Sequence, residues 1–295
     1  MVTFYRRMPK FDYIKPKSID EALDLLAKGN NGKCRAYAGG TDLIPKLKGR
    51  VLNSPETLVD LKGIPDLDYI DYDEQSGMRI GALATVRSVA TSLIVKERYP
   101  VLSQAAGSIA SIQVQNRGTI VGNICNAVPS ADAAPALLCL GARLLCVGKK
   151  GERRVGIEEF FKGPGETILD SAELLTEIHL PPMPENSRGV YIKLSPRSKM
   201  DLAVVGVAAV AGTEKGLIKD VKIGLGAVAP TPLRARGAEG LLGGERVNDE
   251  VIKKAAQKAS EESKPIDDHR ASAEYRKMMV EVLVERALRQ VLSVS

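Results

Sequence analysis

The first 55 residues alternate between helical and extended hydrophobic patterns. Residues 18–21 form a capping box, in which the serine hydroxyl accepts the amide of the glutamate and the glutamate side chain reaches back. A helix is predicted from there to Gly29, because its apolar positions share one face: Ile19, Ala22, Leu23 and Leu26. Residues 35–38 then predict a short buried strand, and residues 43–48 predict a second helix with Asp42 as its N-cap.

From residue 57 the alternation continues as far as a proline cluster at 181–184. We predict strands at 58–60 and 78–82, helices at 85–96, 100–109 and 133–141, a hairpin of strands at 143–147 and 153–155, and a strand at 174–180. Residues 113–132 are rich in Asn, Gly and small side chains but low in charge, which favours a packed loop over a flexible linker. Because proline restricts itself and its predecessor to extended geometry, the cluster at 181–184 is the predicted domain boundary.

The second predicted domain, residues 185–295, has strands first and helices after them. The strands are predicted at 191–194, 202–211 and 218–227, and the helices at 234–242, 249–262 and 273–292. This order favours an α+β domain in which an antiparallel sheet is covered by helices on one face. Two domains also agree with the length of 295 residues, since one domain usually takes ~100–200.

Composition excludes several functional classes. No run approaches the ~20 apolar residues of a membrane helix. The start of the chain has no apolar segment of a signal peptide, so we expect a cytoplasmic protein without a membrane span. The net charge of +6 raises the question of nucleic acid, but there is no Trp and no run that interleaves aromatic and basic residues, so we expect no nucleic-acid partner. Four cysteines without a C-x-x-C pair, and two histidines, predict neither a metal site nor a disulfide framework.

Two glycine-bearing segments carry the candidate chemistry. In residues 38–43, two glycines stand between a predicted strand and a helix, where the backbone can turn sharply and its amides can approach an anion such as a pyrophosphate. Residues 119–123 contain Gly122 between short polar side chains, and Asp132 follows as an acceptor for hydroxyl groups. Together the segments suggest a long, polar, phosphate-bearing ligand, although a tight connection and a compact self-satisfied loop remain open for each alone. The glycines at 224 and 226 precede two prolines and no helix, so we interpret them as a strand end.

In three ordered motifs the chain resembles the FAD-binding medium subunits of the molybdenum hydroxylases, the family of xanthine dehydrogenase and carbon monoxide dehydrogenase. The motifs are AGGTDLIPKLK at 38–48, TIVGNICNAVPSADAAPALLCLGA at 119–142 and LGAVAPTPLRA at 225–235. The resemblance implies a vanillyl-alcohol-oxidase-type (PCMH) FAD-binding domain in two α/β lobes, about 1–55 and 56–180. The smaller C-terminal domain of the family then occupies 185–295.

The resemblance also implies which residues bind FAD. They are Ala38, Gly39, Gly40, Thr41, Asp42, Leu43, Thr119, Val121, Gly122, Asn123, Asp132, Leu174 and Lys193. By motif match, the first six and the segment 119–123 hold the diphosphate, Asp132 binds the polar chain or ring of the flavin, and Leu174 packs near the ring. Lys193 aligns with a lysine near the flavin, where a cation would stabilise negative charge on the reduced ring, and a surface lysine is the alternative. Ile109 occupies a position where some relatives place an aromatic side chain over the flavin.

In function, the resemblance implies an oxidoreductase component with no catalytic residue and no metal ligand of its own. Substrate would be oxidised at a molybdopterin cofactor in a large subunit, and two [2Fe-2S] clusters in a small subunit would deliver electrons to FAD in this chain. The expected assembly is a dimer of heterotrimers that passes electrons to an external acceptor. The cysteine-bearing insertion for a [4Fe-4S] cluster in one branch of the family is missing between residues 132 and 174. Two alternatives stay open: a free-standing FAD-dependent oxidoreductase of the same fold, and a flavin-free scaffold.

Overall fold

The first lobe is built on a small parallel sheet. The computed structural model describes residues 7–29, 33–197 and 200–293. Strands β1 (Asp12–Ile14), β3 (Thr57–Asp60) and β2 (Cys34–Tyr37) pair in that order, and helices α1 (Ile19–Lys28) and α2 (Leu43–Lys48) belong to the same lobe. Helix α1 packs three buried side chains against the sheet: Ala22, Leu23 and Leu26. Because β3 pairs with both other strands, this sheet extends past the lobe limit of about 55.

The predicted start of α1 is confirmed at its N-cap. The hydroxyl of Ser18 accepts the amide of Glu21 at 3.2 Å, and the Glu21 carboxylate accepts the amide of Lys17 at 2.8 Å. The prediction that residues 35–38 form a buried strand is wrong in its burial, because β2 is only partly covered. The uncovered side of β2 faces the cavity described below, so its side chains line a site instead of a core.

The second lobe has a five-stranded antiparallel sheet flanked by short helices. The sheet runs β4 (Ile70–Asp73), β5 (Gly77–Gly81), β10 (Glu173–Leu180), β6 (Arg143–Gly148) and β7 (Gly151–Gly156). The helices are α3 (Val86–Thr91), α4 (Leu93–Arg98), α5 (Pro100–Gly107), α6 (Ile112–Gln115), α7 (Ile120–Cys125), α8 (Ala133–Cys139) and α9 (Ile157–Phe160). A 3-10 turn, η2 (Leu61–Gly63), follows the first sheet, and β8 (Phe161–Gly163) pairs with β9 (Glu166–Thr167). The hairpin of β6 and β7 confirms its prediction.

Two local predictions in this lobe are wrong. The helix predicted at 85–96 is broken at Ser92, which ends α3 and begins α4. Residues 113–132 are not a loop throughout, because they contain the end of α6 and the whole of α7. Each of these two helices starts at a hydroxyl N-cap, Ser111 and Thr119, and such a cap offsets the low helix propensity of the Asn and Gly residues that follow.

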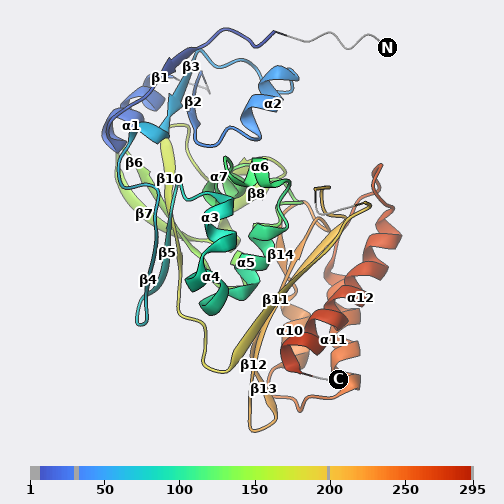
Figure 1. Cartoon of the computed structure of the whole chain (residues 1–295). Coiled ribbons are helices and arrows are strands. Elements are labelled where there is room, and N and C mark those ends of the chain that lie inside the picture. The colour runs from blue at the N-terminus through green and yellow to red at the C-terminus, as the bar shows by residue number, and fades with distance from the viewer. Residues whose placement is uncertain (1–6, 30–32, 198–199, 294–295) are drawn as a thin grey trace.

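The C-terminal domain is a four-stranded antiparallel sheet followed by three helices. The strands pair in the order β11 (Ser187–Leu194), β12 (Val205–Glu214), β13 (Leu217–Gly226) and β14 (Leu233–Arg234). Helices α10 (Arg236–Leu242), α11 (Asp249–Glu262) and α12 (Ala273–Leu292) cover one face of this sheet (Figure 1). The predicted α+β order of strands and then helices is confirmed.

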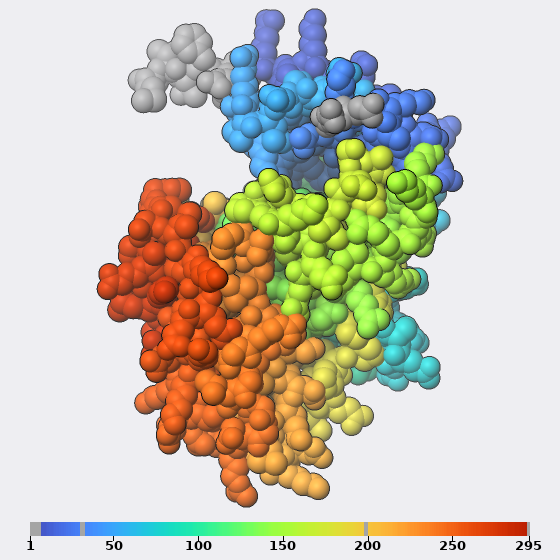
Figure 2. Space-filling view, turned by 180° about the vertical axis from the view of Figure 1, so that it is seen from behind, coloured from blue at the N-terminus to red at the C-terminus, as the bar shows by residue number. Residues whose placement is uncertain are grey.

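The other face of this sheet packs against the second lobe. Along β12, Val207 and Ala209 belong to the core under the three helices, whereas Ala208 and Val210 belong to the core that holds α5 and α8. Alternate residues of a strand point to opposite faces, so one strand joins the two domains. Seen from behind, the C-terminal domain lies along the side of the second lobe, and the first lobe sits at one end (Figure 2).

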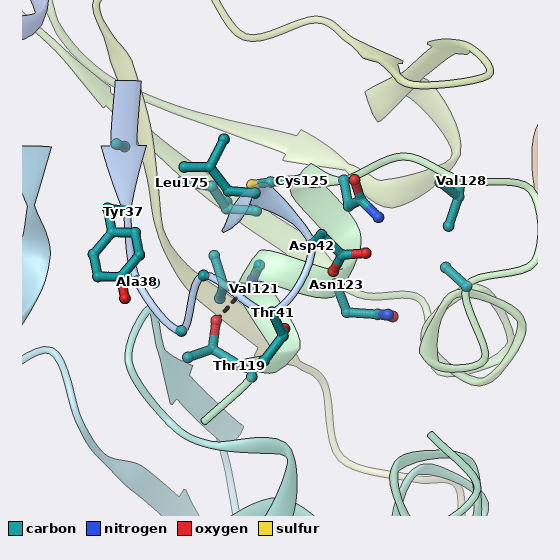
Figure 3. Close-up of a pocket in the computed structure, with 18 of the residues that line it drawn as sticks. Tyr37, Ala38, Thr41, Asp42, Thr119, Val121, Asn123, Cys125, Val128 and Leu175 are labelled. Carbon is teal, nitrogen blue, oxygen red and sulfur yellow. Dashed lines mark hydrogen bonds between the residues drawn. The ribbon is translucent and has the colours of Figure 1, made fainter. Parts of the chain in front are cut away.

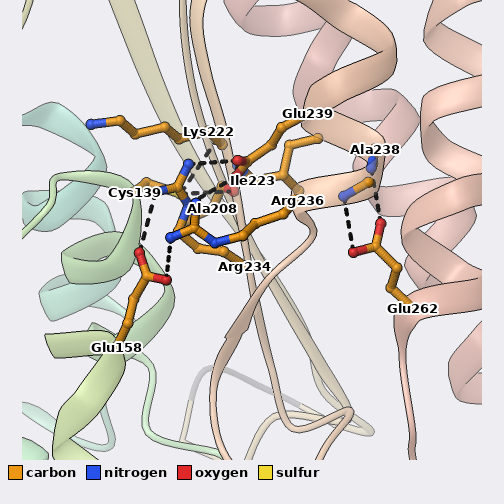
Figure 4. Close-up of polar contacts among 11 residues, drawn as sticks. Cys139, Glu158, Ala208, Lys222, Ile223, Arg234, Arg236, Ala238, Glu239 and Glu262 are labelled. Carbon is orange, nitrogen blue, oxygen red and sulfur yellow. Dashed lines mark hydrogen bonds and ion pairs between the residues drawn. The ribbon is translucent and has the colours of Figure 1, made fainter.

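Ion pairs complete the contact between the domains. Glu158 of α9 accepts from Arg236 at 2.6 Å and from Arg234 at 3.3 Å, as Figure 4 shows. Arg234 is also paired with Glu239 at 2.5 Å.

Across residues 7–29, 33–197 and 200–293, no helix combines the length and the apolar character that a bilayer crossing requires.

Candidate functional site

A cavity of about 820 Å³ lies where the two lobes and the C-terminal domain meet. All thirteen residues predicted to bind a ligand line it: Ala38, Gly39, Gly40, Thr41, Asp42, Leu43, Thr119, Val121, Gly122, Asn123, Asp132, Leu174 and Lys193. Figure 3 shows several of them converging from separate segments of the chain. The volume is within the range of cofactor sites, about 300–1,000 Å³.

The first glycine loop, residues 38–43, owes its glycines to two different constraints. A Cβ on Gly39 would lie 1.9 Å from the carbonyl oxygen of Arg117, so the loop touches the backbone just before the second segment here. Gly40 has a φ of +71°, and a Cβ there would lie 2.4 Å from the ring of Tyr37. Both positions therefore exclude larger residues, one by close backbone approach and the other by conformation and packing.

Five consecutive backbone amides of this loop have no hydrogen-bond partner among the residues that the structure describes. Within the described chain, no hydrogen bond uses the N–H groups of residues 39–43, while the amide of Ile44 already bonds to the carbonyl of Gly40 at 2.9 Å. Buried or half-buried amides normally find an acceptor. Because these residues line the cavity, the acceptor that fits them is a ligand with several oxygens.

The second segment reaches the cavity through the first turn of α7. The Thr119 hydroxyl accepts the amide of Gly122 at 2.9 Å, and that hydroxyl is also the one atom within 4 Å of a Cβ built on Gly122. The side of Gly122 that faces the cavity is therefore open. The Oδ1 atom of Asn123 is buried and has no hydrogen-bond partner among the described residues. A buried acceptor without a donor fits a ligand that carries hydroxyl groups.

Asp42 stands at the predicted N-cap position of α2, but its side chain does not cap the helix. Its backbone is already helical, and its side chain makes no capping hydrogen bond. Burial raises the pKa of Asp42, while Lys46 and a hydrogen bond with Asn126 oppose that rise. Lys46 itself donates to the Asn126 side chain, and Asp42, Lys46 and Asn126 all line the cavity.

Asp132 and Lys193 form a buried ion pair that joins the two domains. The Lys193 ammonium donates to Asp132 at 2.8 Å and to the carbonyl of Ser108 at 3.0 Å. The Tyr191 hydroxyl donates to the other Asp132 oxygen at 2.7 Å. Both ion-pair side chains are under 9% exposed, so the alternative of a surface lysine at 193 is wrong. Burial raises the pKa of Asp132, against the lowering effect of Lys193 and Tyr191.

Apolar side chains line the remainder of the cavity. Leu174 is 5% exposed on β10 and packs in the same core as α1. Ile109 is also buried and lines the cavity, so this position offers aliphatic packing and no aromatic ring. The ring at the cavity wall is that of Tyr37, at the end of β2, which sequence reasoning did not single out.

Sequence reasoning also missed Lys46, Asn126 and Tyr191. Lys46 lies one helical turn after Asp42, which is a usable signal, and Asn126 lies one turn after Gly122. Tyr191 stands two residues before Lys193 on β11, so both side chains point to the same face of the sheet. No signal in the sequence links Tyr191 to Asp132, because the two residues are 59 positions apart.

The residues present fit a phosphate-bearing dinucleotide such as FAD. Residues 39–43, whose amides have no partner among the described residues, Gly122 and Asn123 with its unpartnered oxygen all line one cavity. Among the described residues, no cluster of His, Cys, Asp or Glu has the arrangement of a metal site. The four cysteines are free thiols.

Comparison with known proteins gives consistent matches over nearly the whole chain. Residues 9–183 match the family described as FAD binding domain in molybdopterin dehydrogenase, and residues 190–291 match the CO dehydrogenase flavoprotein C-terminal domain.

The chain is 36% identical to the glyceraldehyde dehydrogenase medium chain of Sulfolobus acidocaldarius, over 96% of this chain and 99% of the relative. It is also 36% identical to the carbon monoxide dehydrogenase medium chain of Hydrogenophaga pseudoflava, over 95% and 96% of the two chains. A solved structure of carbon monoxide dehydrogenase from the latter organism, lacking the Mo-pyranopterin moiety of its cofactor, superposes with a TM-score of 0.93 at 35% identity. That match covers 97% of this chain and 99% of the other.

Proposed function

Because this chain belongs to the family of FAD-binding subunits of molybdenum hydroxylase-type dehydrogenases, we propose that it is the electron-transfer subunit of such an oxidoreductase. It would receive electrons from [2Fe-2S] clusters of a small subunit and pass them to an external acceptor. The observation that carries the proposal is the convergence of both glycine segments and the Asp132–Lys193 pair on one cavity.

We assign the residues of the cavity to two ends of the cofactor. The unpaired amides of residues 39–43, with the open face at Gly122, would hold the diphosphate. The Asp132–Lys193 pair would lie at the flavin end, where Leu174 and Ile109 supply apolar packing and exclude water. When bound, FAD supplies a redox centre that takes up and returns electrons. The protein groups bind it, orient it and set the charge around it.

The proposed partners of the chain are supported by the same family membership. Two relatives are named as medium chains, which supports a heteromeric assembly. The proposed partners are a small iron–sulfur subunit and a large molybdopterin subunit, in a dimer of heterotrimers located in the cytoplasm. Domains 1–180 and 185–295 are proposed as the FAD-binding and C-terminal units. Residues 1–6, 30–32, 198–199 and 294–295 of these ranges lie outside the described part of the chain.

The first test is the cofactor content of the native complex. We expect FAD to remain with this chain when the subunits are separated, and molybdenum and iron to remain with the co-purifying subunits. A flavinated chain without partners would favour a free-standing FAD-dependent oxidoreductase. A colourless chain would contradict flavin binding altogether.

The second test places the diphosphate by substitution. Gly122→Val projects a branched side chain into the open face and displaces the Thr119 cap, so we expect FAD affinity to fall about 100-fold with the fold retained. Gly156→Val is the matched control, because Gly156 has open space around its Cα and does not line the cavity. Isothermal titration of the flavin-free full chain measures both. Equal FAD affinity in Gly122→Val and Gly156→Val would place the diphosphate elsewhere.

A further inference from the structure

Four side chains form a connected group next to the first glycine loop. They are Tyr13 of β1, Tyr37 of β2, Asp60 of β3 and Lys62 of the turn η2, and we refer to them as the Lys62 brace. Of the four, Tyr37 also lines the cavity. The brace connects all three strands of the first sheet to the loop at residues 38–43.

Lys62 is the centre of the brace. Its ammonium donates to Asp60 at 2.6 Å and to the carbonyl of Ala38 at 2.7 Å, and it lies 3.9 Å from the centre of the Tyr37 ring. These three contacts use a carboxylate, a carbonyl and an aromatic face, each of which attracts a cation. The first residue of the glycine loop is therefore fixed by a charged hydrogen bond.

Asp60 is in turn held from several sides. It is 1% exposed, and it accepts hydrogen bonds from the Tyr13 hydroxyl and from the Lys62 amide at 3.1 Å. Burial alone would raise the pKa of Asp60, but the bonds from Lys62 and Tyr13 outweigh it and lower the pKa. The same bond raises the pKa of Tyr13 to about 12. The carboxylate is thus a fixed anion that orients the Lys62 ammonium.

Tyr37 contacts both the brace and the centre of the loop. Its ring packs edge-on against Tyr13, with centroids 6.3 Å apart, and fills the space next to the Cα of Gly40. The loop is therefore held twice, at the Ala38 carbonyl by Lys62 and at Gly40 by Tyr37. Between and after these two points lie the amides of residues 39–43 that have no partner in the described chain.

We propose that Lys62 is a positioning residue for the diphosphate of FAD, acting through the Ala38 carbonyl and the Tyr37 ring on the amides of residues 39–43. The inference rests on the proposed function. Lys62 fixes the loop in the conformation in which these amides face the cavity, so the ligand meets them already oriented. Its effect is confined to the diphosphate end of the cavity and does not reach the flavin end at Asp132.

The test compares Lys62→Met with Lys62→Arg in the flavin-free full chain. The methionine keeps most of the side-chain length but removes the charge, whereas arginine keeps the charge and the donors. The control is Lys33→Met, which removes the same charge from an exposed ion pair of the same lobe. Titrations use three probes: FAD, ADP as the diphosphate without a flavin, and riboflavin as the flavin without a phosphate.

For Lys62→Met we expect FAD and ADP affinities to fall by the same factor, about 10- to 100-fold, with riboflavin affinity unchanged. Lys62→Arg should recover most of the loss, and Lys33→Met should bind like the wild type. Wild-type FAD affinity in Lys62→Met would overturn the proposal, and so would an equal loss of riboflavin, which indicates a general loosening of the cavity. Failure of the wild type itself to bind FAD would instead contradict the proposed function.

Removing Lys62 leaves the buried Asp60 without its cation, so the variant is checked for folding by circular dichroism. If Lys62→Met does not fold, the double variant Asp60→Asn with Lys62→Met removes both charges and takes its place. The same selective loss of FAD and ADP over riboflavin is expected from it. An unchanged FAD affinity in the folded double variant would overturn the role of Lys62.

Discussion

Two carboxylates in this protein, the buried Asp132 and the half-buried Asp268, are held by cations, and their environments differ both in burial and in the number of cations. Asp132 has one cation, Lys193, and one hydroxyl, that of Tyr191. Asp268 lies between two arginines, with Arg270 at 2.5 Å and Arg276 at 2.7 Å. Burial raises the pKa of Asp132, whereas hydrogen bonding to Arg270, followed by the charges of both arginines, lowers the pKa of Asp268 despite desolvation.

We interpret the Asp268 cluster as structural and the Asp132 pair as part of a binding site. Arg276 is 1% exposed and also donates to the carbonyls of Val204 and Ala227, so the Asp268 cluster ties distant backbone segments of one domain together. The Asp132 pair crosses between domains and faces the cavity. A carboxylate that is only partly compensated by its neighbours, and that lines a cavity, is typical of functional sites.

The largest effect is expected when the structural cluster is broken. Asp268→Ala leaves Arg276 buried without its counter-charge, and we expect the free energy of unfolding to fall by about 3–5 kcal/mol. FAD affinity of the folded fraction should not change, since neither arginine lines the cavity. Urea denaturation and flavin titration measure the two quantities.

The control for this variant is Asp71→Ala, which breaks an exposed ion pair with Arg79 on the second lobe. Such a pair contributes at most about 1 kcal/mol. If Asp268→Ala were no less stable than Asp71→Ala, the assignment of the Asp268 cluster as a structural tie would be wrong.

Substituting Asp132 should change the free energy of unfolding less than Asp268→Ala does, but should lower FAD affinity more. Asp132→Asn keeps the shape and the bond from Tyr191 but removes the charge that balances Lys193. Because the raised pKa of Asp132 means that its charge already costs free energy in the folded state, we expect the free energy of unfolding to change by at most about 1 kcal/mol, and FAD affinity to fall about tenfold. Tyr191→Phe is the companion variant, because it removes a neutral donor only. Wild-type FAD affinity in Asp132→Asn would remove this pair from the flavin end.

The sequence alone locates the glycine loops because their constraints are local. A glycine pair between a strand and a helix at residues 38–43, and Gly122 after a hydroxyl cap, are visible without knowledge of the fold. The capping box at 18–21 places the start of α1, and the apolar periodicity places the three C-terminal helices within a few residues. Three local predictions are wrong: the burial of β2, the continuity of the helix at 85–96, which is interrupted at Ser92, and the absence of helices inside 113–132.

The partners of the site residues are not visible in the sequence because they come from distant segments. Asp132 meets Lys193 across 61 positions and two domains, and Lys62 meets the Ala38 carbonyl across 24. Nothing in the pattern around Gly39 shows that its Cα faces the backbone of Arg117. The sequence therefore predicts that glycine is needed at both positions. Only the structure shows that the reason is backbone contact at Gly39 and a positive φ with ring packing at Gly40.

The smallest expected effect is a difference in the pH dependence of the two carboxylates, and it follows from the opposite directions of their pKa shifts. The lowered pKa of Asp268 means that its stabilisation is present above the unfolded value of about 3.9 and is lost as the pH falls through and below it. The raised pKa of Asp132 means that the folded state takes up a proton at a higher pH than the unfolded state, so its charged form costs free energy that is relieved as the pH falls towards about 3.9. Asp132→Asn and Asp268→Asn serve as non-titrating references. As the pH falls, the free energy of unfolding of the wild type should rise relative to Asp132→Asn by about 1 kcal/mol. At the lowest pH values it should fall relative to Asp268→Asn by about 1 kcal/mol. Urea denaturation of the three proteins from about pH 7 down to about pH 3.5 measures both differences. Changes of the same sign would show that the two carboxylates titrate alike and that the distinction between a structural and a cavity-facing cluster does not hold.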